Sequence, residues 1–368
     1  MSLLKSIPKV DKFIMNEAFE GLSRTLITKI AKKTLEELRN DILNNKIEKI
    51  DENTLINEVL DSYKDLTSPS LKSLINATGI IVHTNLGRSL LDEKSLTKAM
   101  KIATTYNNLE YDLKKGKRGE RYEHITKSLQ ALTSCEDAIV VNNNASAVFL
   151  ILNTFCKNKE VIVSRGELVE IGGSFRVPEV MNQSGAKLKE IGTTNKTHLR
   201  DYENAICEKT SMLMKVHKSN YSIEGFSSEV SFEDIVKIAQ QNNLIDYFDM
   251  GSGHIIDLPY NLNKDEPSIL DIMKYKPSLL SFSGDKLFGS VQAGIIIGKK
   301  ELIAKIKKNQ LLRMLRVDKI TLVLLEETLN SYLKNELDNI PTVQYPNEGN
   351  DVDIKQLEDD RNSSTGNV

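Results

Sequence analysis

The sequence predicts an α/β fold, with a mostly parallel sheet and helices on both faces, that follows an all-helical unit. From residue 74 onward, short apolar runs alternate with helical stretches such as "SFEDIVKIAQQNN", a pattern typical of strand–helix–strand units. Residues 9–65 instead carry apolar side chains at helical spacing and contain no proline. These two textures divide the chain into a helical unit, 1–66, and a larger α/β domain, 67–335.

The helical unit is rich in lysine and glutamate, as in "FEGLSRTLITKIAKKTLEELRNDIL". Lys29, Lys32, Lys33 and Arg39 recur on spacings that can form one basic face. Such a face is either a solvated surface or a contact for a polyanion. The segment "TSPSLKS" (67–73) then predicts a linker.

Six apolar runs in the larger domain predict buried strands of a parallel sheet. They are 138–142, 160–166, 212–217, 244–251, 278–284 and 293–298. Beyond them, residues 346–368 contain six acids and hardly any large apolar side chain. We therefore expect 336–368 to be a polar, disordered tail.

The composition fits a globular protein with a sizeable core, since 40% of the residues are hydrophobic and 27% are charged. The net charge of -2 excludes bulk attraction to nucleic acid, so a polyanion would need a local basic patch. Three isolated cysteines form neither a disulfide framework nor a zinc motif, and no metal site is predicted. Without a leader-like segment or a long apolar run, we expect a cytoplasmic protein with no membrane span.

The segment "SFSGDKLFGSVQAGIIIG" (281–298) places Lys286 where an apolar strand ends. Ligands of open α/β sheets bind at the carboxyl edge of the strands. A partly desolvated lysine there has a lowered pKa and can form a Schiff base. The alternative is a lysine that pairs with Asp285 or extends into solvent.

Three more features lie at strand ends. The turn "VVNNNASAV", with Asn143, Asn144 and Ala145, precedes a helix and offers backbone N–H groups to a phosphate. His217 could stack on a flat ring, and Asp249 could hold a pyridine nitrogen protonated. Each has an ordinary structural alternative: a common βα turn, a histidine satisfied by its neighbours, and a helix or loop cap. Together with the lysine, in this chain order, they predict a pyridoxal-phosphate site.

Arginines indicate an anionic substrate. Arg88 stands in "HTNLGRS" and Arg121 in "KKGKRGERY", while Arg313 and Arg316 in "LLRMLRVDK" are expected on one helix face because they are three residues apart. Guanidinium groups bind phosphate-like anions in bidentate fashion. Ordinary surface ion pairs are the alternative.

These blocks, with "INATGIIVHTNLGRSLL", "VIVSRGELVEIGGSFRVPEVM" and "EIGTTNKTHLRDYENAI", resemble the bacterial selenocysteine synthases (SelA), the L-seryl-tRNA(Sec) selenium transferases. The resemblance extends from about residue 7 to about residue 335. It implies a fold-type-I pyridoxal-phosphate enzyme preceded by a tRNA-binding helical domain. It also implies a homodecamer, a pentamer of dimers, with active sites at dimer interfaces.

The resemblance assigns a role to each candidate residue. Lys286 matches the lysine that forms the Schiff base, and its neighbour Asp285 joins the catalytic set. The cofactor-binding residues are then Asn143, Asn144, Ala145 and Ser283 at the phosphate, Asp249 at the pyridine nitrogen and His217 on the ring. The pocket for selenophosphate takes Arg88, Arg121, Arg313 and Arg316, with Arg121 preferred to Arg118.

The implied reaction converts seryl-tRNA(Sec) to selenocysteyl-tRNA(Sec) with selenophosphate, through a dehydroalanyl-tRNA intermediate. Relatives of this kind carry a further small α/β domain after the region that matches residue 335, and this chain instead has the polar segment. Two alternatives therefore remain: a non-catalytic remnant that binds tRNA or co-assembles, and a pyridoxal-dependent lyase for a small phosphorylated amino acid. The donor could also be a sulfur compound.

Overall fold

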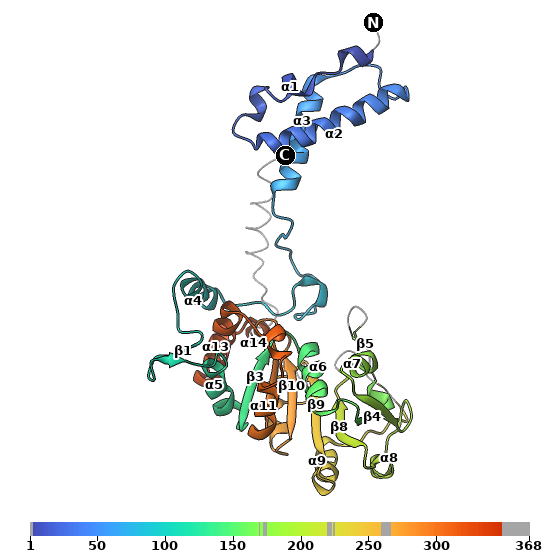
Figure 1. Ribbon diagram of the computed structural model, residues 1–368, viewed down its shortest axis with the longest axis vertical. Coiled ribbons are helices and arrows are strands. Elements are labelled where there is room, and N and C mark those ends of the chain that lie inside the picture. The colour runs from blue at the N-terminus through green and yellow to red at the C-terminus, as the bar shows by residue number, and fades with distance from the viewer. Residues whose placement is uncertain are drawn as a thin grey trace. The chain divides into compact units, whose positions relative to one another are not determined.

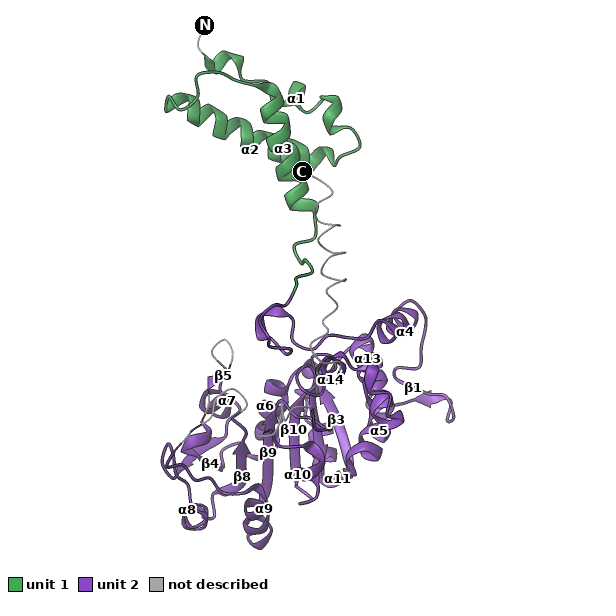
Figure 2. Cartoon of the chain, turned by 180° about the vertical axis from the view of Figure 1, so that it is seen from behind, with its two compact units in different colours: residues 1–75 green, residues 76–368 purple. Residues whose placement is uncertain are grey.

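The chain forms two compact units, Met1–Ile75 and Asn76–Val368, which are coloured separately in Figure 2. The computed structural model describes residues 3–168, 170–171, 175–218, 223, 225–258 and 266–347. The first unit includes the predicted linker at its end, where residues 68–75 form neither helix nor strand. The predicted boundary at 66/67 falls at the end of the last helix of this unit, Thr67.

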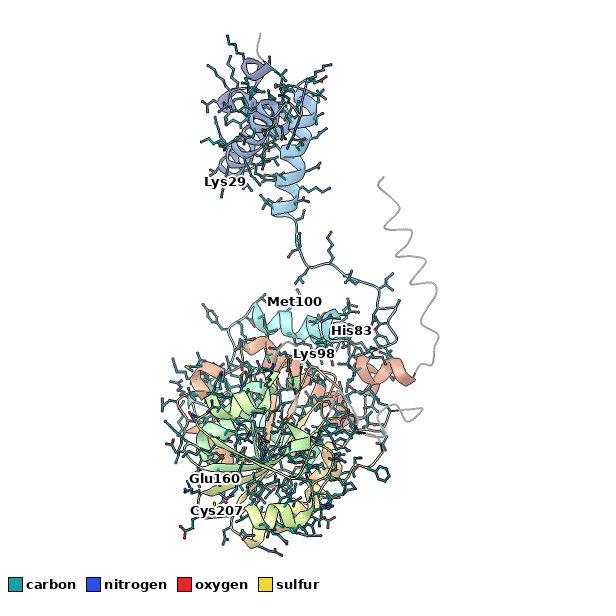
Figure 3. The ribbon with its side chains drawn as sticks, turned by 90° about the vertical axis from the view of Figure 1, so that its right-hand side faces the viewer. Lys29, His83, Lys98, Met100, Glu160 and Cys207 are labelled. Carbon is teal, nitrogen blue, oxygen red and sulfur yellow. The ribbon has the colours of Figure 1, made fainter. Side chains whose placement is uncertain are left out.

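The first unit is helical, as the apolar spacing predicts. Its helices are η1 (Leu3–Ser6), α1 (Val10–Phe13), η2 (Glu17–Phe19), α2 (Arg24–Leu43) and α3 (Glu52–Thr67). α2 and α3 bury one face each around a core of their own that includes Phe13, Ile27 and Val59. The opposite face of α2 carries the basic residues, and Lys29 is exposed there (Figure 3). This unit therefore has the hydrophobic core that independent folding requires.

The second unit is built on a seven-stranded sheet with the order β3-β11-β10-β9-β8-β4-β7. The strands are β3 (Asp137–Val141), β4 (Glu160–Ser164), β7 (Lys187–Ile191), β8 (Thr210–Val216), β9 (Ile245–Gly251), β10 (Leu279–Ser283) and β11 (Gly294–Gly298). Two small ribbons pair β1 (Tyr111–Asp112) with β2 (Lys117–Arg118) and β5 (Glu170–Ile171) with β6 (Phe175–Arg176). All six predicted strands are present.

Helices cover both faces of this sheet (Figure 1). They are η3 (Thr84–Leu86), α4 (Glu93–Ala103), α5 (Glu123–Thr133), α6 (Asn144–Phe155), η4 (Arg165–Glu167), α7 (Val177–Gln183), α8 (Leu199–Ala205), α9 (Phe232–Gln241), α10 (Ile269–Met273), α11 (Lys300–Lys307), α12 (Leu312–Leu315), α13 (Lys319–Lys334), η6 (Leu337–Asn339) and α14 (Pro341–Asn347). Within β3, Ala138 and Val140 belong to the core cluster that includes α5, α9 and α13, whereas Ile139 and Val141 belong to the cluster that includes α6 and α11. Most side chains of the central strands are thus buried on one face or the other, which explains their continuous apolar runs.

The sheet departs from the prediction at two strands. β11 runs antiparallel to both of its neighbours, so its assignment as a parallel strand was wrong. Only residues 284–293 connect it to β10, and a parallel crossover needs a dozen residues or more. β7 was not predicted, because "KLKEI" is a polar strand at the edge of the sheet.

The segment expected to begin a disordered tail is ordered at its start. Residues 337–347 form η6 and α14, with Ile340 and Val343 buried against the core that contains Phe288. The predicted start of the tail at 336 was therefore wrong, and the remainder, 348–368, lies outside the described residues. Pro341 starts α14, a position where its fixed φ favours the helix.

None of the helices formed by the described residues combines the length and the apolar character that crossing a membrane requires.

Candidate active site

The turn between β3 and α6 lies at the carboxyl edge of the sheet. Asn143 caps α6, because its Oδ1 accepts a hydrogen bond of 2.8 Å from the N–H of Ser146. Gly294 of β11 lies against this turn, and a Cβ at that position would collide with the carbonyl oxygen of Asn143. Glycine therefore permits the close approach of the strand to the helix start. The N–H groups of Asn144 and Ala145 have no acceptor among the described residues, and together with the dipole of a twelve-residue helix they favour an anion.

Asp249 lies on β9 with only 4% of its surface exposed. Its Oδ1 accepts hydrogen bonds from Asn144 Nδ2 at 2.7 Å and from the N–H of Gly251 at 3.1 Å. Its Oδ2 has no hydrogen bond among the described residues. Burial raises the pKa of this carboxyl, and the bonds from Asn144 and Gly251 only partly offset that effect. A cationic ring nitrogen at Oδ2 would restore the ionised form.

Lys286 follows β10 in a turn that Ser89 holds in place. The Oγ of Ser89 donates to the carbonyl oxygen of Lys286 at 2.5 Å, and its N–H donates to that of Asp285 at 3.2 Å. The Nζ of Lys286 makes no hydrogen bond or ion pair with any described residue. Burial lowers the pKa of this amine, Asp249 opposes that shift, and the nearby Arg88 adds to it. The result is a reactive amine that is not committed to a partner.

His217 is at the end of β8, where its N–H donates to the carbonyl oxygen of Asp249 at 2.9 Å. Its Nε2 lies 2.8 Å from Oε2 of Glu266, which also accepts from Ser252 Oγ at 2.8 Å. Sequence reasoning missed Glu266, which stands in no motif and at no strand end, and Ser252, which directly follows β9 but was not distinguished from the loop around it. Their contacts fix the orientation of the imidazole ring beside Asp249.

These groups fit pyridoxal phosphate. An uncommitted amine, a buried carboxylate oxygen, an oriented imidazole and a helix start are all at the carboxyl edge of the sheet. Ser283 is buried at the end of β10 and pairs in register with Gly294, close to the helix start. The Oδ1 atom of Asn144 is buried without a partner among the described residues, which leaves an acceptor for a ligand donor.

Arg88 contacts the lysine turn and not the other predicted arginines. Its Nη1 binds Oδ2 of Asp285 at 2.8 Å, and this carboxylate is 10% exposed. Arg88 has a φ of 65°, in the left-handed region that non-glycine residues seldom adopt. Such strain is typical of functional sites. Asp285 is thus a partner of Arg88, whereas Lys286 is not held by it.

Arg121, Arg313 and Arg316 line one cavity of about 330 Å³, together with Arg118 and Glu110. The expectation that Arg313 and Arg316 share a helix face was wrong, because α12 ends at Leu315. Arg316 is extended, and its backbone bridges to Val141 at the end of β3. The N–H of Asn142 also donates to the carbonyl oxygen of Leu315 at 2.9 Å. The cavity is therefore connected directly to the turn that precedes α6.

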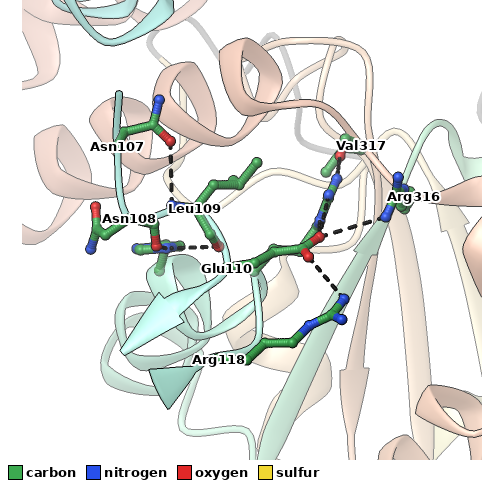
Figure 4. A network of polar contacts seen from close by, with 9 residues as sticks. Asn107, Asn108, Leu109, Glu110, Arg118, Arg316 and Val317 are labelled. Carbon is green, nitrogen blue, oxygen red and sulfur yellow. Dashed lines mark hydrogen bonds and ion pairs between the residues drawn. The ribbon is translucent and has the colours of Figure 1, made fainter. Parts of the chain in front are cut away.

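Glu110 joins the arginines of this cavity (Figure 4). Its Oε1 accepts from Nε and Nη2 of Arg121 at 3.2 and 2.5 Å, and lies 3.5 Å from Nη1 of Arg316. Its Oε2 accepts from Nη2 of Arg118 at 3.0 Å. The hydrogen bonds from Arg121 lower the pKa of Glu110 despite partial burial. Sequence reasoning did not predict this carboxylate, although "NNLEYDL" precedes the arginine motif.

Comparisons with known proteins identify the family of the chain. The family model for SelA, "L-seryl-tRNA selenium transferase", matches residues 74–358. The chain belongs to this family. It is 98% identical over 347 residues to the L-seryl-tRNA(Sec) selenium transferase of Aliarcobacter butzleri (strain RM4018), an alignment that covers 94% of this chain and 77% of that protein. The corresponding protein of Sulfurimonas denitrificans is 68% identical, with the same two coverages.

Solved structures show the same fold. D-glucosaminate-6-phosphate ammonia-lyase matches with a TM-score of 0.59 at 22% identity, over 74% of this chain and 70% of that one. A tetra mutant of Thermus thermophilus aspartate aminotransferase matches with a TM-score of 0.51 at 16% identity, over 74% and 76%. Membership of the SelA family confirms the predicted fold class, the transferase class and pyridoxal phosphate as the cofactor. The roles of individual residues stay predictions.

Proposed function

We propose that this chain converts seryl-tRNA(Sec) into selenocysteyl-tRNA(Sec), with selenophosphate as the selenium donor. The observation that carries the proposal is the uncommitted amine of Lys286 beside Asp249 at the carboxyl edge of the sheet. The names of the relatives support the tRNA substrate. The arginine cavity next to the turn before α6 supports an anionic second substrate.

In this proposal, Lys286 would attach the cofactor, Asp249 would face its ring nitrogen, and His217 would stack on its ring. The helix start at Asn143, Asn144 and Ala145, with Ser283, holds its phosphate. When bound, pyridoxal phosphate supplies an electron sink for the electron pair released at the α-carbon of the seryl group. Asp249 supports that role because a carboxylate at the ring nitrogen favours its protonated form.

The side chains then move protons and bind anions. The amine of Lys286 takes the α-proton, because its lowered pKa favours the neutral, basic form. Arg313 and Arg316 bind the donor anion through N–H groups that match phosphate oxygens. The seryl hydroxyl leaves with a proton as water, the selenium of selenophosphate bonds to the β-carbon while the α-carbon regains a proton, and a water molecule cleaves the P–Se bond to release phosphate. Placement of both substrates at one sheet edge makes their encounter effectively intramolecular.

The experiment is direct synthesis with the full chain, loaded with pyridoxal phosphate. Incubation with seryl-tRNA(Sec) and selenophosphate is expected to yield selenocysteine on the tRNA, identified by mass after hydrolysis of the ester. Arg313→Ala should reduce the yield without changing the cofactor absorption. Recovery of serine alone would contradict the proposal. If thiophosphate yields cysteine on the tRNA as fast as selenophosphate yields selenocysteine, the donor assignment would change from selenium to sulfur.

The first unit is the proposed tRNA contact, because its exposed basic helix face has a core of its own beneath it. Removal of residues 1–66 should weaken binding of seryl-tRNA(Sec) and leave cofactor loading intact. Equal tRNA affinity after the deletion would reject this assignment. We also propose a cytoplasmic homodecamer, a pentamer of dimers, and the molar mass in solution tests that assembly.

A further inference from the structure

The cavity that contains Arg313 and Arg316 already holds a carboxylate. Glu110 occupies the centre of the guanidinium cluster, where it accepts hydrogen bonds from Arg118 and Arg121 and lies near Arg316 (Figure 4). An incoming phosphate-like anion would meet the same donors. Any anion that binds there must therefore compete with a group of the protein itself.

The three arginines are not held equally. Arg121 is 11% exposed, and three of its five N–H groups are used, by Glu110 Oε1 and by the carbonyl oxygen of Val317. Arg118 is 78% exposed and makes one hydrogen bond to Oε2. Arg316 is 3.5 Å from Oε1, a separation for an ion pair but not for a strong hydrogen bond.

This gradation separates the arginines into two roles. The contact with Arg121 is short, uses two N–H groups on one carboxylate oxygen and involves a guanidinium that is largely buried, so it persists when a ligand enters. The contacts with Arg118 and Arg316 are exposed or long, and such pairs contribute little net free energy. Arg313 makes no side-chain hydrogen bond or ion pair with the described residues and is free to bind a ligand. The groups available to a ligand are thus Arg313, Arg316 and the exposed Arg118.

We propose that Glu110 is a positioning residue that serves as the internal counter-anion of this cavity: it anchors Arg121, lends part of its charge to Arg316, and weakens the binding of the phosphate that the reaction releases. This inference rests on the proposed function, because it assumes that the anionic donor enters this cavity. Without a counter-anion, the cluster would retain inorganic phosphate after each turnover.

The test is the binding of inorganic phosphate to the full, cofactor-loaded chain, measured by calorimetry for the wild type and Glu110→Gln. Glutamine keeps an oxygen for Arg121 and removes the charge. We expect phosphate to bind about 5-fold more tightly or better, because a like charge about 4 Å away opposes the ligand by about that factor in water. The difference should shrink as salt is raised.

Two variants separate charge from shape. Glu110→Asp keeps the charge and is expected to bind phosphate as weakly as the wild type. Glu120→Gln is the matched control, since Glu120 lines the same cavity but its carboxylate pairs with none of the described residues. Its removal should tighten phosphate binding less than the change at Glu110. In turnover, Glu110→Gln should lower both KM for the donor and kcat, whereas a purely structural role would raise KM.

The outcomes distinguish this inference from the proposed function. If phosphate binds to the wild type and is lost in Arg313→Ala, but Glu110→Gln binds it equally or more weakly, Glu110 only organises the arginines and the inference is overturned. If neither phosphate nor the selenium donor requires Arg313 for binding, the cavity is not the donor site. The proposed function then loses its anion pocket as well.

Discussion

Asp249 and Glu110 are two acidic side chains of the same unit whose pKa values shift in opposite directions. Asp249 is 4% exposed among neutral donors, and burial raises its pKa. The side chain of Glu110 is 31% exposed among guanidinium groups, and the hydrogen bonds from Arg121 lower its pKa. Desolvation dominates at the cofactor end, and paired charge dominates in the arginine cavity. Asp249 thus needs a cationic group of the ligand to become ionised. Glu110 is already paired with arginines, so an anionic ligand has to compete with it for them.

The largest effect is expected at the amine. Lys286→Ala should abolish covalent attachment of pyridoxal phosphate and lower kcat by about 10²- to 10⁴-fold, the usual contribution of a positioned acid–base group. Absorption spectra and single-turnover rates measure the two effects. Lys300→Ala, at an exposed lysine of α11, is the control and should match the wild type. A retained cofactor band in Lys286→Ala would place the attachment elsewhere.

The next effect is expected at the buried carboxylate. Asp249→Asn keeps an oxygen for Asn144 and Gly251 but removes the charge that would face the ring nitrogen. The rate of α-proton exchange from the seryl group should fall by about 10²- to 10³-fold, as when one electrostatic stabiliser is removed. Exchange of solvent deuterium into the substrate measures this rate. Exchange at the wild-type rate would show that Asp249 does not contact the ring nitrogen.

A smaller effect should appear in the pH dependence of cofactor attachment. Burial lowers the pKa of Lys286, and repulsion from Arg88 adds to that shift. Arg88→Gln removes the repulsion and leaves Asp285 without its cation, so both changes raise the pKa of the lysine. The pH at which the apo-protein attaches pyridoxal phosphate at half its maximal rate should therefore move upward. Arg313→Gln is the control, and an equal or downward shift in Arg88→Gln would refute the electrostatic assignment.

The smallest effect concerns the stability of the cofactor-free protein. Folding raises the pKa of Asp249, so its ionisation destabilises the folded state once the pH exceeds the pKa of the unfolded carboxyl. Asp249→Asn should therefore raise Tm at pH 7 and not at pH 3. Folding lowers the pKa of Glu110, so its ionised form stabilises the folded state when the pH is above the pKa of the unfolded carboxyl. Glu110→Gln should therefore lower Tm at pH 7, and this loss should vanish in acid. Calorimetric shifts on the order of 2 °C are expected. Shifts of the same sign in both variants would contradict the comparison.

Patterns in the sequence were sufficient where burial determines the residue type. The six apolar strands, the helix start at Asn143 and the lysine turn all lie where their patterns place them. The direction of β11 was lost because an apolar run carries no direction, although the short connection to β10 was a usable signal. η6 and α14 were missed because their apolar residues, among them Ile340 and Val343, are scattered among polar ones.

The acidic partners could not be predicted for a different reason. Glu110 meets Arg121 through the β1–β2 ribbon that separates them, and Glu266 meets His217 after two segments 49 residues apart have been brought together. Arg316 leaves the helix face because its backbone pairs with Val141, a tertiary contact that the spacing of Arg313 and Arg316 does not encode. The sequence therefore indicates on which side of the molecule a loop charge lies, but only the fold determines which group it pairs with.

The most direct test of a cofactor site built around Lys286 is the visible absorption spectrum of the full chain loaded with pyridoxal phosphate and titrated with seryl-tRNA(Sec). We predict a band from the attached cofactor that shifts as the charged tRNA is added, does not shift with uncharged tRNA, and is absent in Lys286→Ala. A band that does not shift when seryl-tRNA(Sec) is added, or one that is still present in Lys286→Ala, would contradict the proposed site.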